Sequence, residues 1–358
     1  MSNQQELLEV LDRAENQRQA RRNFIRMCGG AAAMTGGLSL LSACGGDDSD
    51  NNSGTGGTTP TPTATASPTT VEQSVLNFAL NLEYLEGNYY TYAVTGAGIP
   101  TSLQAGTGTR GNAITGTGAG AARAVSFTDP TIAQYAREIA ADELAHIAFL
   151  RTALGGVAVA QPALNISGSA TVTAPSGASV VGAFTAAARA AGVIGPSDIF
   201  DPYASDINFL IGSYLLTDVG VSAYRGSARL LINNKVFLEA SAGILATEAY
   251  HDGVIRSSIY ARGIAATPPL INGQTVFQAV QRISDSRDAL DGPADLDQGI
   301  GDATTANLVP TDANSLALGR TAPQVLNVVY LNAQPVSSGG FFPAGVNGSI
   351  NTSSNAGT

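Results

Sequence analysis

The stretch Asp142-Glu143-Leu144-Ala145-His146 places a glutamate three residues before a histidine, and Glu248-Ala249-Tyr250-His251 repeats this spacing later in the chain. These are the only 2 histidines in the sequence. Three residues along an α-helix turn the side chain by about 300°, so each glutamate and its histidine share one face and can bind a metal ion together. Chance would place a glutamate before both histidines about once in a thousand sequences. The two motifs therefore predict two helices that face each other across a metal site.

Four long helices are predicted around these motifs. Apolar residues recur at intervals of three and four along 71–94, 129–155, 206–232 and 235–262. Thr70 and Gln73 have the spacing of a capping box, and Asp129 is followed by a proline at the first helical position. The segment between the second and third helices holds a β-prone tract at 165–181 and a short helix at 183–191. A connection of this length can join opposite ends of a bundle, so we expect an all-α four-helix bundle with a long crossover.

Carboxylates on the inward faces of the helices extend the predicted site. The first helix carries Glu83 among apolar residues, where an unpaired carboxylate is costly unless a metal ion or a proton meets it. The third helix carries Asp218, for which an interhelix salt bridge is the alternative role. Glu86, or the region around Thr217, stays open as a replacement for an assigned ligand. The predicted metal ligands are Glu83, Glu143, His146, Asp218, Glu248 and His251.

This pattern resembles the ferritin-like superfamily, and more closely the bacterial ferritin-like proteins related to plant desiccation-related proteins. The resemblance rests on Asn81 to Glu86, Asp142 to His146, Asp218 to Val221, Ala223-Tyr224 and Gly339 to Pro343. It implies a di-iron or di-manganese site with one carboxylate from each of two helices and a Glu-x-x-His motif from each of the others. Carboxylates and imidazoles suit Fe and Mn, whereas calcium does not use histidine and a closed zinc site has fewer carboxylates. We therefore expect two divalent ions, Fe or Mn.

The expected function is redox chemistry on peroxide or dioxygen, of the peroxidase, catalase or oxidase type, in protection against oxidative or drying stress. The alternative is a non-enzymatic envelope protein that keeps the bundle for packing or partner binding. A cage-forming iron store is disfavoured, because a lipid tether and a C-terminal extension would hinder closed-shell assembly. Arg151 and Arg256 each follow a motif glutamate by eight residues, and we expect them to pair with carboxylates on neighbouring helices.

Composition excludes some classes of partner. The formal net charge is −10 with 18 lysines and arginines, so the chain lacks the basic surface that nucleic acid binding requires. Hydrophobic residues make up 44% of the sequence, which is ample for a core. The oligomeric state is left open, with a dimer among the alternatives.

The first residues predict export. Arg21-Arg22 begins a twin-arginine block, and the apolar run 29–41 is too short to span a bilayer, so residues 1–43 form the predicted signal peptide. The residues before Cys44 resemble a bacterial lipobox, which predicts a lipid on Cys44 and attachment to a membrane of the periplasm or cell envelope. An ordinary signal with an incidental cysteine is the alternative. Cys28 lies inside the signal, so we expect no disulfide in the mature chain.

The predicted domains follow from these boundaries. Residues 44–69 are a low-complexity linker that cannot bury enough apolar surface to fold, and residues 70–264 form the bundle. Residues 265–358 form a C-terminal extension with one helix at 275–290 and loops. Its apolar stretches at 326–331 and 339–342 are expected to fold back onto the bundle.

Overall fold

The structure is a computed structural model that describes residues 69–357. The predicted signal peptide, Cys44 and the predicted linker up to residue 68 lie outside the described residues. Within 69–357, no helix has both the length and the apolar character needed to cross a membrane.

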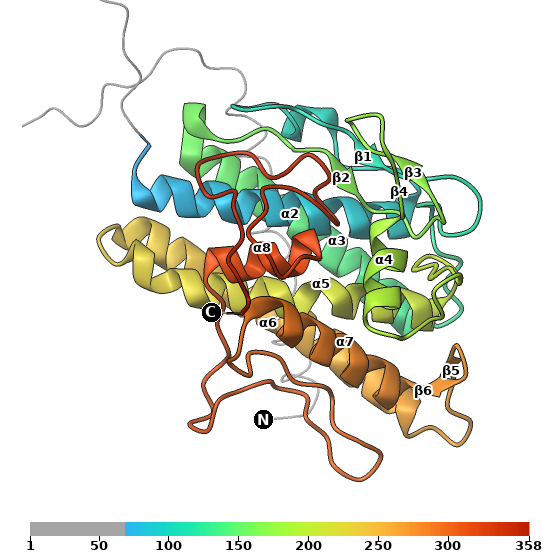
Figure 1. Cartoon of the computed structure of the whole chain (residues 1–358). Helices are drawn as coiled ribbons and strands as arrows, with labels where there is room; N and C mark the ends of the chain where they lie inside the picture. Colours follow the sequence, from blue (N-terminus) through green and yellow to red (C-terminus); the bar gives the residue numbers. More distant parts are fainter. Residues whose placement is uncertain (1–68, 358) are drawn as a thin grey trace, which may run out of the picture. The chain divides into compact units, whose positions relative to one another are not determined.

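The four predicted long helices are present and pack as two pairs (Figure 1). α2 (Val71–Thr95) packs along α3 (Pro130–Leu154), and α5 (Asp206–Ser227) packs along α6 (Lys235–Gly263). A short 3₁₀ helix, η4 (Ala228–Leu231), follows α5 and leads into α6. The predicted all-α bundle with a long crossover is confirmed.

The helices begin where the sequence predicts them to begin. Thr70 and Gln73 form a complete capping box at the start of α2, in which each side chain bonds to the other residue's backbone N–H. The side chain of Asp129 caps α3, which opens on a proline. Ser205 and Asn234 cap α5 and α6 in the same way. These caps satisfy backbone N–H groups that have no partner within the helix.

The crossover between the pairs is mostly irregular, with short strands. It holds the 3₁₀ helix η3 (Gly155–Val157) and the strands β2 (Leu164–Asn165), β3 (Val172–Thr173) and β4 (Ser179–Val180). β2 pairs in parallel with β1 (Ala113–Ile114), from the loop that joins α2 to α3 and also contains η2 (Thr101–Leu103). β3 pairs antiparallel with β4, and α4 (Ala183–Ala190) follows. The predicted β-prone tract and short helix are thus both found.

The C-terminal extension differs from its prediction. It contains two helices, α7 (Val276–Asp291) and α8 (Ala322–Tyr330), and a small hairpin of β5 (Leu270–Ile271) with β6 (Gln274–Thr275), where we expected one helix. The missed α8 has 9 residues and is buried from Val325 to Tyr330. With 9 residues, α8 makes only about two to three turns, which is too short for a helical period to be distinguished from a short apolar run.

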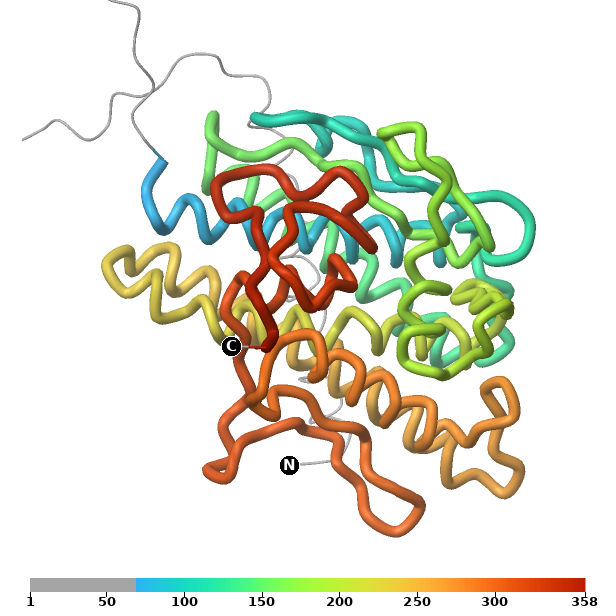
Figure 2. Tube along the Cα trace, in the orientation of Figure 1, coloured from blue at the N-terminus to red at the C-terminus, as the bar shows by residue number. Residues whose placement is uncertain are grey.

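The end of the extension folds back against the bundle. Phe341 and Phe342 belong to the core, and the ring of Phe341 packs edge-on against Phe184 of α4. The backbone N–H of Asn347 donates to Oδ1 of Asn81 in the middle of α2, at 2.9 Å. In Figure 2 the red C-terminal trace crosses the blue trace of α2. This covering leaves α2 buried on every side from residue 75 to residue 91. The carboxylates of α2 therefore lie in a low-dielectric interior.

Candidate metal centre

Four acidic and histidine side chains from three helices meet inside the bundle. They are Glu83 of α2, Glu143 and His146 of α3, and Glu248 of α6, and one ligand atom of each lies within 4.8 Å of the others. Glu143 is fully buried, and Glu83 and Glu248 are each 1% exposed. A charged carboxylate is stable at such depth only when a cation, a proton or several donors accompany it. The cluster therefore has the composition and the burial of a metal site.

His146 lies at the centre of this cluster. Its Nδ1 atom is 3.2 Å from Oε2 of Glu83, 3.5 Å from Oε1 of Glu248 and 3.8 Å from Oε2 of Glu143. One imidazole nitrogen thus faces carboxylates from α2, α3 and α6. The side-by-side placement of Glu143 and His146 follows from their spacing on α3.

His251 lies on the other side of Glu143. Its Nδ1 atom is 3.2 Å from Oε1 of Glu143, and its Nε2 atom is 3.2 Å from Oδ2 of Asp142. We assign the ring proton to Nε2, donating to Asp142, which is the usual way that a carboxylate orients a metal-binding histidine. In the protein without metal, a second ring proton on Nδ1 would face Oε1 of Glu143, because the neighbouring carboxylates raise the pKa of His251. A metal ion in place of this proton would meet the lone pair of Nδ1, so His251 is a candidate metal-binding residue.

Several buried atoms of the centre have no hydrogen-bond partner among the described residues. They are both carboxylate oxygens of Glu143, both of Glu248, and Nδ1 of His251. Buried polar atoms are almost always hydrogen-bonded, so five orphans in one cluster need an explanation. Fe and Mn ions bind carboxylate oxygens and imidazole nitrogens, and the residues present fit such ions.

The electrostatics of the protein without metal lead to the same conclusion. Burial raises the pKa of Glu83 to about 8, with further contributions from the charges of Glu143 and Glu248 and opposition from His146. Burial would also raise the pKa of Glu143, but the two imidazoles outweigh it and hold that pKa well below its usual range. The pKa of His251 rises to about 10, because Asp142 and Glu143 outweigh the effect of burial. Without metal, the site retains protons as its only source of positive charge.

Comparison with known proteins agrees with this geometry. A family model described as a ferritin-like domain matches residues 72–261, which is more than half of the chain. The chain belongs to the ferritin-like family. The desiccation-related protein PCC13-62 of Craterostigma plantagineum is 30% identical over 282 residues, covering 75% of this chain and 81% of that protein. The ferritin-like catalase Nec2 of Nesocodon mauritianus is 26% identical over 288 residues, covering 77% and 83%. No solved structure matches the chain.

One predicted ligand of the ferritin-like centre lies elsewhere. Asp218 of α5 accepts hydrogen bonds from Nη1 of Arg256 at 2.9 Å and from Nη2 of Arg287 at 2.5 Å. Burial would raise the pKa of Asp218, but the two guanidinium groups hold it below its usual value. Both carboxylate oxygens of Asp218 are bound to arginines, so Asp218 is not in the cluster. It forms an interhelix salt bridge, which is the alternative role considered for it.

Arg151 and Arg256 were both expected to pair with carboxylates on neighbouring helices. Arg256 pairs with a carboxylate on a neighbouring helix, as expected. Arg151 does not, and instead donates to the hydroxyl of Tyr84 at 2.7 Å and to the carbonyl of Ala105. Arg287 continues the network to Asp297 of the C-terminal extension at 2.8 Å. The extension is therefore joined to the bundle by buried ion pairs.

The residues of α5 that face the centre are Gly220 and Tyr224. The hydroxyl of Tyr224 donates to Oε1 of Glu83, and a Cβ built on Gly220 would lie 3.1 Å from Oε2 of Glu248. These two positions are four residues apart and share a face, whereas Asp218 is about 200° away from Gly220 around the helix. Neither Tyr224 nor Asp142 is among the predicted metal ligands. The adjacent acidic residues Asp142 and Glu143 were the sequence feature that could have indicated a role for Asp142.

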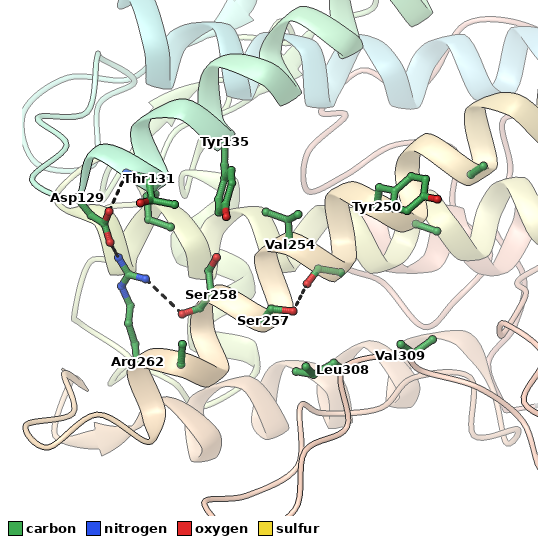
Figure 3. A pocket seen from close by; sticks show the side chains of 15 residues that line it. Asp129, Thr131, Tyr135, Tyr250, Val254, Ser257, Ser258, Arg262, Leu308 and Val309 are labelled. Atoms are coloured by element: carbon green, nitrogen blue, oxygen red, sulfur yellow. Dashed lines mark hydrogen bonds and ion pairs between the residues drawn. The ribbon is translucent and has the colours of Figure 1, made fainter. Parts of the chain in front are cut away.

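A surface groove of about 1020 Å³ runs along the outer side of α3 and α6 (Figure 3). Its walls include Tyr135, Tyr250, Val254, Leu308 and Val309. At one end, Nη2 of Arg262 is 2.7 Å from Oδ2 of Asp129. No carboxylate or imidazole of the metal centre is among the residues that line it. The groove is therefore separate from the centre.

Proposed function

We propose that this ferritin-like chain binds two Fe or Mn ions and uses them in redox chemistry on peroxide or dioxygen. In this role the exported protein would protect the cell against oxidative or drying stress. The observation that carries the proposal is the buried cluster of Glu83, Glu143, His146 and Glu248, with its unpartnered oxygens. One relative is named a catalase and another a desiccation-related protein, which supports the choice of chemistry and setting.

The residues divide into two groups around Glu143. His146 lies near Oε2 of Glu143 and near Glu83, and His251 lies near Oε1 of Glu143. These carboxylates and imidazoles would hold two Fe or Mn ions. The ions, when bound, would supply redox chemistry on peroxide or dioxygen.

The chain also provides a group that can hold a proton beside the centre. Glu83 accepts a hydrogen bond from Tyr224 at Oε1 and faces Nδ1 of His146 at Oε2. In the protein without metal, burial and neighbouring carboxylates favour its protonated form. Where a carboxylate oxygen of Glu83 is not bound to an ion, it would hold a proton for exchange with the substrate.

The proposal includes export and lipid attachment, and its support is the sequence of residues 1–44 alone. The test is expression in a bacterium with an intact twin-arginine pathway, followed by cell fractionation and mass analysis of the mature protein. We expect protein in the envelope membrane fraction, beginning at Cys44 and carrying lipid. Release of a Cys44→Ser variant from that fraction would support the anchor, and an unlipidated wild-type chain would disprove it.

Metal analysis of the natively exported protein tests the central claim. We expect about two Fe or Mn ions per chain, and loss of most of this metal in a variant with His146→Ala and His251→Ala. The control is Tyr250→Phe, because Tyr250 is 77% exposed on the same helix as His251. The proposal would be disproved if the wild-type chain bound less than about one ion and the double variant had the same metal content.

Peroxide turnover is a separate measurement on the loaded protein. We expect peroxide consumption that follows metal content across wild type and variants. Two ions without turnover would favour the alternative of a metal-binding envelope protein with no enzymatic role.

A further inference from the structure

A fourth buried carboxylate lies beside the metal centre. Glu86 follows Glu83 by three residues on α2, and its side chain is in the fully buried part of that helix with 5% exposure. The three-residue spacing puts the two glutamates on neighbouring turns of the same face. Glu86 can therefore reach the same interior space as Glu83.

The position of Glu86 is defined by Gly220 on α5. A Cβ built on Gly220 would lie 3.4 Å from each carboxylate oxygen of Glu86 and 3.1 Å from Oε2 of Glu248. The two carboxylates thus border the small space that a side chain at position 220 would enter. In this bundle, a glutamate from α2 occupies the region where a carboxylate from α5 would otherwise point.

No described residue donates a hydrogen bond or forms an ion pair with the Glu86 carboxylate, although the nearby hydroxyl of Tyr90 is buried and lacks a partner. The Glu86 carboxylate lies beside that of Glu248 at the space left by Gly220, and both oxygens of Glu248 lack hydrogen-bond partners. Buried carboxylates that lie side by side need a cation or a proton between them.

We propose that Glu86 is a ligand of one of the two metal ions, beside Glu248, in place of a carboxylate from α5. Gly220 leaves the space that this arrangement needs. The inference rests on the proposed function, because it applies only if the chain binds two ions. The competing explanation is that Glu86 is a protonated carboxylic acid with a packing role only.

The variant Glu86→Gln separates these explanations, because an amide matches the shape of a protonated carboxyl group but is a poor metal ligand. We expect the metal content to fall from about two ions per chain to about one. After loading with Mn(II), the electron paramagnetic resonance spectrum should change from that of a coupled pair to the hyperfine pattern of an isolated ion. The control is Glu138→Gln, an exposed glutamate of α3, which should keep both ions.

Two bound ions in Glu86→Gln, with unchanged affinity and a coupled spectrum, would overturn the inference and leave the proposed function intact. A wild-type chain without metal would instead reject the proposed function itself. If Glu86→Gln does not fold, Glu86→Asp replaces it as the test, because the shorter side chain keeps the charge but withdraws the carboxylate from the centre. Loss of one ion or a lowered affinity in Glu86→Asp would support the inference, and two ions with unchanged affinity would overturn it.

Discussion

The hydroxyl group of Tyr224 on α5 donates a hydrogen bond to Oε1 of Glu83 on α2, while Nδ1 of His146 lies 3.2 Å from the other oxygen of that carboxylate. Glu83 is thus oriented by two groups from two other helices. Residues that orient a metal ligand are expected to affect affinity and leave the number of ions unchanged.

Removal of this hydroxyl group should weaken metal binding. In Tyr224→Phe, Glu83 loses its donor but keeps its place on α2, so we expect two ions per chain with affinity lowered about 10- to 100-fold. Competition with a chelator of known affinity measures this. The control is Tyr135→Phe, because Tyr135 lines the outer groove away from the centre. Equal affinities in wild type and Tyr224→Phe would show that the hydrogen bond does not support the site.

The role of Asp218 predicts a loss of stability without a loss of metal. Asp218→Asn would leave Arg256 and Arg287 without their shared anion, and breaking a buried ion pair typically costs about 3–5 kcal/mol. Denaturant unfolding measures the loss, and metal analysis should still find two ions per chain. The control is Asp295→Asn at an exposed position of the extension. Loss of an ion at unchanged stability would return Asp218 to the ligand set.

The pH dependence of the metal-free protein should follow the protons that its centre retains. The pKa of Glu83 is raised to about 8 from 4.5, and that of His251 to about 10 from 6.5. Raised pKa values mean that the folded state binds these protons more tightly than the unfolded state does. The resulting stability is complete below the unfolded values and is lost as pH rises through the folded ones. Glu143, with its lowered pKa, affects stability only in more acidic solution.

We therefore expect the free energy of unfolding of the metal-free protein to fall steadily between about pH 5 and pH 10. In the metal-loaded protein the fall should be smaller or reversed, because metal binding displaces these protons and strengthens as pH rises. Urea unfolding at several pH values, with chelator or with excess Mn(II), makes the comparison. A metal-free protein that gains stability with rising pH would contradict the assignment of protons to the centre.

Close packing between α5 and the extension predicts that Gly226→Ala is destabilising. A Cβ on Gly226 would lie 1.8 Å from the backbone oxygen of Arg320, whose guanidinium pairs with Asp291 at 2.6 Å and with Asp297 at 2.7 Å. Moving Arg320 would disturb these buried pairs, so we expect a loss of about 1–3 kcal/mol, typical of overpacking. The matched control is Gly243→Ala in α6, where a Cβ would meet nothing within 4 Å. There alanine should stabilise the helix by up to about 1 kcal/mol, and thermal unfolding of both variants gives the comparison. A gain of stability in both variants would show that the C-terminal extension moves to accommodate a methyl group at Gly226.

The sequence predicted the features that depend on neighbouring residues along the chain. The capping box at Thr70 is made within one turn of helix, and its chemistry can be recognised without knowing the fold. The pairing of Glu143 with His146 likewise follows from the helical repeat alone. The echo of this spacing at Glu248 and His251 then required two helices to face each other, which the bundle confirms.

The choice of residue on α5 could not be made in this way. Asp218, Gly220 and Tyr224 are close in sequence, but the rotation of α5 about its axis decides which of them faces the centre. That rotation is set by contacts far away in the chain: Asp218 is held by Arg287 of α7, and Gly226 meets the backbone of Arg320. The sequence by itself therefore determined the helices and the two Glu-x-x-His pairs. Only the tertiary structure turned Asp218 toward its arginines and left Glu86 and Gly220 beside the centre, because packing between distant segments fixes how a helix is rotated.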